Sequence, residues 1–544
     1  MHVDAVGVRS RRPVVVAAAG LFAACLVWRF LTFDGFSNDH YAHLALAQQM
    51  LLGDRPVRDF YDPGWPLTYL LSAIAWRTWG SAMGTEWALT AGALAIGAAC
   101  TVVAADRLSR SLPIAVLVAT VEILIYPRSY AYPKVLAYAV GACALVAVAA
   151  RPSPRRLFGL AATVAVAFLL RHDHGLYLGV AAAVCVAMAS RAAGWRTSIR
   201  RVAALTAIAA TLLLPWILFV SFNGGLLAYF EGVIEFARAE ATANTLRSWP
   251  ALMDANTPLQ VNADAWLFWV FWSLPLLCGV MAARRMVQGQ ERWPGECAAV
   301  AALALLAIVV NAGFLRDILQ TRLADAIVPA VLLSAWALGV CWIGRWRRRP
   351  IQVLLQVVTL IVLVVSLQQV GRVAQVVDRT SGTGIGDGLG AVRERAVAVF
   401  RLLSGPHRQG ALPPSRYSAA LMPFFAYLDR CTSPEDRLIV TGEFPDVLVL
   451  AGRRFAGDGV VFGAWYSSTA HQQRTIERMQ ARSVPFALLV GDYADFDILD
   501  GYLKRKYEPM AKVPVDDAGS IVILVERDRS PLRTDPATGW GCFR

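Results

Sequence analysis

The chain has 544 residues, of which 57% are hydrophobic and 17% are charged. Soluble globular proteins carry about 25% charged residues, so this composition excludes an ordinary cytosolic enzyme and a disordered or collagen-like chain. The net charge of +13 first suggests a nucleic-acid partner, but the basic residues must be located before the surplus is interpreted. The nine cysteines form no CxxC pair, so their spacing indicates no zinc or thioredoxin-type motif.

Long apolar segments predict an α-helical polytopic membrane protein. A spanning helix needs about 20 mostly apolar residues. We count about eleven candidate transmembrane helices: 13–33, 88–105, 112–127, 133–150, 157–170, 174–190, 202–222, 265–283, 296–313, 325–343 and 350–369. Residues 66–80 are also apolar, but a span there would reverse every later loop. We therefore interpret them as a helix lying at the outer interface.

Arginine positions orient these spans. With the N-terminus inside, the inner loops hold about twice as many Lys and Arg residues as the outer loops. The charge surplus is thus a topology signal with the lipid bilayer as its partner, and it gives little support to nucleic-acid binding. The expected location is the cytoplasmic (inner) membrane, multi-pass, with the C-terminal segment on the periplasmic or extracytoplasmic side.

The domain organisation predicted from these patterns has three parts. Residues 1–370 form the transmembrane domain, with a long first outer loop at 34–87 and a second at 223–264. Residues 371–428 are a Gly-, Arg- and Pro-rich linker with a helix near 391–403. Residues 429–544 alternate strand and helix patterns: RLIVTG, GVVFG, a helix at 469–483, FALLVGD, a helix at 494–509 and SIVILVE. This alternation predicts a small extracytoplasmic α/β domain.

Only Cys431 and Cys542 lie outside the predicted transmembrane part. Two cysteines that bracket an extracytoplasmic domain could form a disulfide, and two free thiols are the alternative.

Charged residues gather in the predicted outer loops, where charge next to lipid is expensive and needs a reason. In the first loop, Ser37 or Asn38 can cap a helix from about Asp39 to Leu52, which Gly53 ends. The turn-rich segment DRPVRDFYDPGWP follows. The later outer turns are YPRSYAYPK, RHDHG and FLRDILQTRLAD. A carboxylate-rich loop that meets cationic turns suits transfer chemistry on a lipid-linked anion, since cations bind phosphate and a carboxylate activates an acceptor.

The first loop also carries a recognisable order of residues, NDHYAHLALAQQMLLGDRPVRDFYDPGWPLTYLLSA. This order resembles the first outer loop of the GT-C superfamily of integral-membrane glycosyltransferases, of the dolichyl-phosphate-mannose-protein mannosyltransferase and aminoarabinose transferase type. Asp39 falls on the family's acidic position, Tyr41 on its tyrosine, and Arg58, Asp59 and Phe60 on its middle element. At low resolution the resemblance covers nearly the whole chain.

The resemblance implies an inverting glycosyltransferase of cell-envelope biogenesis. It would move a hexose or pentose from a polyprenyl-phosphate donor to a glycan, lipid or protein acceptor at the outer face. Asp39, at a helix N-terminus where the dipole favours a carboxylate, is the expected catalytic base. The expected phosphate-binding residues are Arg58, Lys134, Arg171, Arg316 and Arg322. The expected supporting residues are Tyr41, Asp59, Asp62 and Asp173.

His40 stands where some members of the family have a second acidic residue. We therefore assign no metal ligands, and a divalent cation remains an open alternative as a cofactor. His172 and His174 resemble a metal pair, but alternate residues cannot share a helix face, which favours hydrogen-bonded roles.

Plainer interpretations stand beside these assignments. Asp39 could be only a helix cap, and Arg171 could extend its charge to the interface. Asp59 and Asp62 could only order the loop by pairing with Arg58. Arg316 and Arg322 could simply form ion pairs with Asp317 and Asp325. The rival functions are a transporter or flippase of lipid-linked glycans, which would show inverted repeats and mid-membrane charges, and a catalytically inactive envelope-assembly subunit.

Overall fold

The computed structural model describes residues 12–243, 249–315, 319–343, 361, 363–405, 415–460, 462, 468–490, 496–515 and 519–544. The chain divides into two compact units, each built from three chain segments. The first unit comprises residues 1–32, 90–213 and 246–396, and the second comprises 33–89, 214–245 and 397–544.

The first unit is helical throughout its described part. Its helices are α1 (Arg12–Leu31), most of α4 (Met83–Ser109), α5 (Leu112–Leu124), α6 (Tyr132–Ala150), α7 (Pro154–Leu170), α8 (His172–Ser190), most of α9 (Trp195–Asn223), α11 (Leu259–Val287), α12 (Glu296–Asn311), α13 (Leu319–Ile343), α15 (Arg372–Ser381) and half of α16 (Leu389–Ser404). Short 3-10 turns lie at Ser129–Ala131, Arg191–Ala193, Ala312–Leu315 and Ile385–Asp387.

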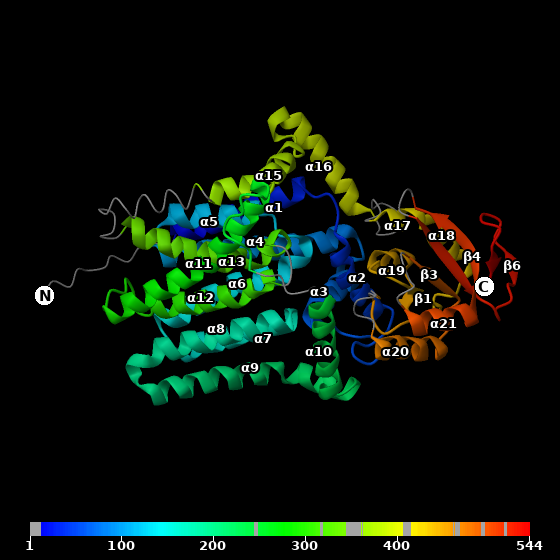
Figure 1. Cartoon of the computed structure of the whole chain (residues 1–544), viewed down its shortest axis with the longest axis horizontal. Coiled ribbons are helices and arrows are strands. Elements are labelled where there is room, and N and C mark those ends of the chain that lie inside the picture. Colours follow the sequence, from blue (N-terminus) through cyan, green and yellow to red (C-terminus); the bar gives the residue numbers. More distant parts are fainter. Residues whose placement is uncertain are drawn as a thin grey trace. The chain divides into compact units, whose positions relative to one another are not determined.

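Helix α12 is central in this bundle, where it contacts α6, α8, α11 and α13 (Figure 1). Small residues allow these helices to approach closely, as is usual for helices in lipid. A Cβ added at Gly339 of α13 would lie 2.3 Å from the carbonyl oxygen of Ser109, and one at Gly175 of α8 would lie 2.1 Å from Cα of Phe168. A larger residue at Gly339 would therefore push α13 away from the end of α4, and a larger residue at Gly175 would push α8 away from α7.

Within the described residues, eight helices are long and apolar enough to cross a membrane. They are α1, α4, α6 with the 3-10 turn before it, α8 with the turn after it, α9, α11, α12 with the turn after it, and most of α13. The membrane character predicted from hydropathy is thereby confirmed. Helices α5 and α7 have only 13 and 17 residues, and residues 350–360 and 362 of the segment 350–369 lie outside the described residues, so the count of eleven spans stays a prediction.

The second unit contains a five-stranded mixed sheet in the order β2-β1-β3-β5-β4. Strand β1 (Arg437–Val440) pairs in parallel with β2 (Arg454–Phe455) and with β3 (Phe486–Leu489). Strand β5 (Ser520–Glu526) runs antiparallel to both β3 and β4 (Tyr507–Pro514). A separate hairpin joins β6 (Arg533–Thr534) to β7 (Gly541–Cys542). Strands β1 and β3 are fully buried, as expected for the centre of a sheet covered on both faces.

The helices of the second unit come from all three of its segments. They are α2 (Asn38–Leu51), α3 (Pro66–Trp79), α10 (Leu226–Ala243), α17 (Arg416–Ala420), α18 (Met422–Cys431), α19 (Pro445–Ala451), α20 (Thr469–Gln480) and α21 (Asp497–Lys506). At 14 residues, α3 is about 21 Å long and too short for a hydrocarbon layer about 30 Å thick. This length agrees with our interpretation of residues 66–80 as a helix that does not cross.

Helix α2 packs against α19 and holds the edge of the sheet. The Gln49 side chain accepts a hydrogen bond of 2.9 Å from the backbone N–H of Phe455 in β2. Arg437 in β1 and Asp54, just after α2, form a buried two-fold ion pair with N–O distances of 2.6 and 2.7 Å. Helix α2 and the residues just after it thus support the edge of the sheet.

Several sequence predictions change in detail. The helix expected at 494–509 ends at Lys506, and the chain continues as β4, which the sequence analysis missed. Strand β4 lies at the sheet edge and leaves Glu508, Pro509, Lys512 and Pro514 exposed, so its pattern is not that of a buried strand. Of the strand expected at 459–463, Phe462 forms only an isolated bridge to Gly442, and its neighbours 461 and 463 lie outside the described residues.

The predicted linker and the cysteine pair also take definite form. Residues 371–428 contain α15, α16, α17 and most of α18, although the domain boundaries themselves stay predictions. Cys431 at the end of α18 and Cys542 in β7 are joined by a disulfide. The alternative of two free thiols therefore does not describe this structure.

Candidate active site

Three turns far apart in the sequence meet in the first unit. Lys134, at the start of α6, is 2% exposed and donates to Asp325 of α13 at 2.6 Å. Arg322, one turn earlier in α13, lies 3.6 Å from the same carboxylate. Arg171, immediately before α8, forms an ion pair of 3.0 Å with Asp173. We call these five residues the cationic cluster.

The charges of the cationic cluster do not cancel. The positive charges of Arg171 and Arg322 both repel Lys134. The Asp325 carboxylate attracts Lys134, and the Asp173 carboxylate attracts both Arg171 and Lys134. Three cations against two carboxylates leave one positive charge in excess. Such an excess next to an apolar bundle favours an anionic ligand that can accept hydrogen bonds from arginine and lysine.

The two histidines beside the cationic cluster have hydrogen-bonded positions. His172 Nδ1 lies 2.7 Å from the carbonyl oxygen of Phe168, and its ring stacks on the Phe168 ring with centroids 4.1 Å apart. His174 hydrogen-bonds through Nδ1 to the buried Tyr138 hydroxyl. These contacts agree with the hydrogen-bonded roles favoured by the sequence.

Arg316 and Asp317 lie outside the described residues, so their expected roles stay predictions. The alternative pairing of Arg322 with Asp325 is present, and that carboxylate is shared with Lys134. Arg322 and Lys134 thus belong to one network.

Asp39 lies in the first turn of α2 with an exposed side chain. Ser37 occupies the N-cap position, but its hydroxyl makes no capping hydrogen bond, so the capping expected of it is not found. Two residues further on, Tyr41 is 1% exposed, and burial raises the pKa of its phenol. Tyr41 therefore anchors α2 in the core of the second unit, and Asp39 is the group presented at the surface.

The Arg-Asp-Phe element after α2 forms a charged contact with α20 and the residues that follow it. The Arg58 side chain is 50% exposed and donates to Asp59 at 2.6 Å. Asp59 also lies 3.4 Å from Nη2 of Arg482, and its carbonyl oxygen accepts a hydrogen bond from Arg478. Burial alone would raise the pKa of Asp59, but hydrogen bonds from Arg58 and the Arg55 backbone lower it. Asp59 thus orders this loop.

Asp62 orders the entrance to α3. Its carboxylate accepts hydrogen bonds from the backbone N–H groups of Gly64 at 2.8 Å and Trp65 at 3.1 Å, and from the Tyr69 hydroxyl at 2.9 Å. These three contacts order the loop that leads into α3, and the supporting role expected of Asp62 stays a prediction.

A buried polar group that the sequence analysis missed lies next to Asp39 in the chain. His40 Nε2 and Glu86 Oε1 are 2.9 Å apart, both side chains are wholly buried, and Ser72 donates to the same oxygen at 3.1 Å. The sequence showed His40 only as a departure from a family pattern. Glu86 carried no signal, since it opens an apolar helix 46 residues away.

An open pocket lies within the second unit. Its apolar wall comes from α2, from the loop before α3 and from the segment before α20, with Ala42, Leu46, Tyr61, Pro63, Trp65, Gly459 and Val460. Its polar end comes from α10, α20 and the loop after β2, with Gly232, Glu235, Asp458, His471 and Arg474.

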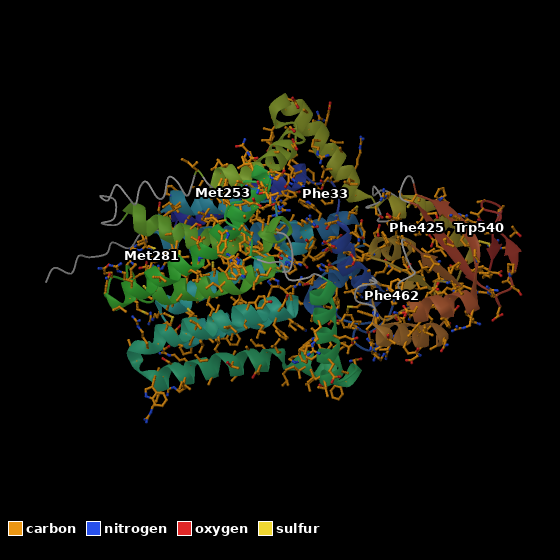
Figure 2. The ribbon with its side chains drawn as sticks, viewed as in Figure 1. Phe33, Met253, Met281, Phe425, Phe462 and Trp540 are labelled. Atoms are coloured by element: carbon orange, nitrogen blue, oxygen red, sulfur yellow. A yellow bond between two sulfur atoms is a disulfide. The ribbon has the colours of Figure 1, made fainter. Side chains whose placement is uncertain are left out.

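The polar end of the pocket is held in place by hydrogen bonds. Arg474 Nε donates to Asp458 Oδ2 at 3.0 Å, and Arg478 lies 2.9 Å from the other oxygen. Ser468, which caps α20, donates to Glu235 at 2.6 Å. Phe462, labelled in Figure 2, packs against the His471 ring with centroids 5.0 Å apart. The sequence could not predict this pocket, because its residues come from three separate chain segments and form no local motif.

We searched the described residues for a metal site. Among them, the only cluster of Asp, Glu, His or Cys side chains close enough together to hold an ion is Cys431, Asp535 and Cys542. The two thiols of this group are joined to each other, so they cannot act as thiolate ligands.

Comparisons with known proteins add no assignment. No family model matches the chain, and no match emerges among the curated proteins. The chemistry of the sites must therefore be argued from their residues.

Proposed function

We propose that this membrane protein is an inverting glycosyltransferase. It would transfer a sugar from a polyprenyl-phosphate donor to an acceptor at the outer face of the cytoplasmic membrane. The observation that carries the proposal is the cationic cluster, in which Lys134, Arg171 and Arg322 converge from three turns predicted on the same side of the bilayer. The GT-C-like loop around Asp39 supports it.

The cationic cluster suits a lipid phosphate. A phosphate monoester is the leaving group, and negative charge accumulates on its oxygens as the glycosidic bond breaks. Arginine can contact two phosphate oxygens at once, and a buried lysine adds a fixed point charge. An excess of one positive charge over Asp173 and Asp325 favours this anion over a neutral ligand.

The reaction needs one general base. In our proposal an acceptor hydroxyl oxygen attacks the anomeric carbon from the face opposite the phosphate, and its proton passes to the Asp39 carboxylate. The bond between the anomeric carbon and the phosphate oxygen breaks, and polyprenyl phosphate leaves with the electron pair. A single displacement of this kind inverts the anomeric configuration.

The test is Asp39→Asn in the full-length chain, reconstituted with a radiolabelled polyprenyl-phosphate sugar and envelope extract as acceptor. We expect at least a hundredfold loss of transfer, because removing a general base typically costs 10²–10⁴-fold. The matched control is Asp34→Asn, an exposed aspartate of the same loop, which should keep near-normal activity.

Near-normal turnover by Asp39→Asn would contradict the assignment. The rival functions predict different outcomes in the same assay. A flippase would move the labelled lipid across liposome membranes without forming a glycosidic bond. An inactive assembly subunit would show neither activity.

A further inference from the structure

We propose that the pocket of the second unit binds a neutral saccharide, which serves as the acceptor of the reaction. The word acceptor rests on the proposed function, whereas saccharide binding rests on the pocket alone. No part of the sequence analysis placed a ligand there.

The apolar wall suits the carbon face of a sugar ring. Tyr61 and Trp65 present aromatic surface, and Leu46 and Val460 extend it. Aromatic faces carry negative charge density and attract the slightly positive C–H groups of a sugar. The lining is mostly apolar with a few polar groups, as is usual for small-molecule sites.

The polar end suits the hydroxyl groups of the same ligand. Asp458 and Glu235 offer carboxylate oxygens and Arg474 offers a planar set of donors, so adjacent hydroxyls can both donate and accept. These groups are positioned before a ligand arrives, since Arg474 and Arg478 hold Asp458, and Ser468 holds Glu235. The site therefore loses little side-chain entropy on binding.

The charge of the pocket does not favour the donor phosphate. The two lining carboxylates, Glu235 and Asp458, are matched by Arg474 and by Arg478, which lies 2.9 Å from Asp458, so no positive charge is in surplus. An anionic headgroup would find no unmatched cation here, in contrast to the cationic cluster of the first unit. A neutral, hydroxyl-rich ligand needs no such cation, and this difference separates the acceptor from the donor.

The pocket is also linked to Asp39 through one helix. Ala42 and Leu46 of α2 line the pocket, and Asp39 lies three residues before Ala42 on the same helix face. A saccharide that lies along this face could extend a hydroxyl toward the first turn of α2. This placement gives Asp39 a substrate within its own unit.

The experiment measures saccharide binding directly, with the detergent-purified full-length chain and no donor. The probes are immobilised neutral gluco-, manno-, galacto- and arabino-oligosaccharides and their phosphorylated counterparts, followed by titration of the strongest hit. We expect a subset of neutral probes to bind better than their phosphorylated forms. Arg474→Gln and Glu235→Gln should each weaken that binding about tenfold or more, since hydrogen bonds to charged groups are lost.

Arg505→Gln is the matched control, because Arg505 is an exposed arginine of α21 outside the pocket lining. This variant should bind the saccharide as the parent chain does. The Arg474 and Glu235 side chains are 44% and 45% exposed, so their variants should fold, and thermal unfolding verifies this. Absence of binding to every neutral probe would overturn the proposal, as would unchanged binding by both pocket variants or preference for phosphorylated probes. Binding without any transfer activity would contradict the proposed function and leave the saccharide pocket standing.

Discussion

The charges of Lys134 and Arg171 cost free energy beside an apolar helix bundle, so each needs a partner or a ligand. Each has a carboxylate partner, Asp325 for Lys134 and Asp173 for Arg171. Each ion pair explains why its cation is tolerated. It does not explain why a third cation, Arg322, also lies 3.6 Å from the Asp325 carboxylate. A phosphate ligand accounts for that surplus.

We predict that Arg171→Gln weakens binding of a polyprenyl-phosphate sugar. The loss of charge-assisted hydrogen bonds should cost about 1.5–3 kcal/mol, which corresponds to about 10–100-fold in Kd. The measurement is equilibrium binding of a fluorescent donor lipid to purified protein. Arg128→Gln, an exposed arginine of a neighbouring outer turn, is the control and should bind normally. Unchanged affinity of Arg171→Gln would count against the phosphate role.

At the same scale, the Arg437–Asp54 pair should be essential for the second unit. Both side chains are less than a tenth exposed, so Arg437→Met leaves a buried carboxylate without its two hydrogen bonds. We expect a loss of about 3–5 kcal/mol in the free energy of unfolding, measured by denaturant titration. The double variant Asp54→Leu with Arg437→Met should recover much of this loss, since it leaves no unpaired charge. Equal destabilisation of both variants would show that packing, not charge, is responsible.

At the scale of elements, the α/β fold is built from pieces that are remote in sequence. Strand β2, at one edge, is held by Gln49 of α2, and β7 is tied to α18 by the Cys431–Cys542 disulfide. Trp540 packs on Tyr427 of α18 with ring centroids 5.1 Å apart, so apolar contact accompanies the covalent link (Figure 2). The C-terminal hairpin is therefore fastened at two points.

We predict that removing this disulfide destabilises the second unit without unfolding the membrane helices. The bond closes a loop between residues 111 apart, and a crosslink of this length contributes about 5 kcal/mol in the chain-entropy model. The measurement is the denaturant midpoint of Cys431→Ala with Cys542→Ala against the parent chain. Reduction of the parent should produce the same shift, and the double variant should not respond to reductant; Cys25→Ala, which removes a free cysteine of α1 and keeps the disulfide, should respond as the parent does. A parent midpoint that ignores reductant would contradict the prediction.

Elements were predicted from the sequence to different degrees, for a physical reason. Hydropathy locates the long helices, because lipid demands an uninterrupted apolar run within one segment. The fully buried strands β1 and β3 were also found, since burial on both faces produces short apolar runs. Strand β4 was missed, because an edge strand keeps polar side chains and is defined by its pairing with β5.

At the scale of the whole molecule, the arginine distribution predicts which side each loop occupies. We expect an alkaline phosphatase fused after Arg544 to be active, since an odd number of spans leaves the C-terminus outside. The same enzyme inserted at Gly194, in a loop predicted inside, should be inactive, and a cytoplasmic reporter there should be active. Cytoplasmic activity of a reporter fused after Arg544 would overturn the predicted topology.

The sequence by itself determined that the protein has long apolar helices suited to a membrane, and it located helix α2 and the core strands of the α/β fold. These features depend on solvent preference and period, which are local properties of a chain. Only the tertiary structure brought Lys134 and Arg322 to the shared Asp325 carboxylate near Arg171, buried His40 against Glu86, and assembled the pocket of Glu235, Asp458 and Arg474. Such sites depend on contacts between segments tens to hundreds of residues apart, and no local pattern encodes which of those segments will meet.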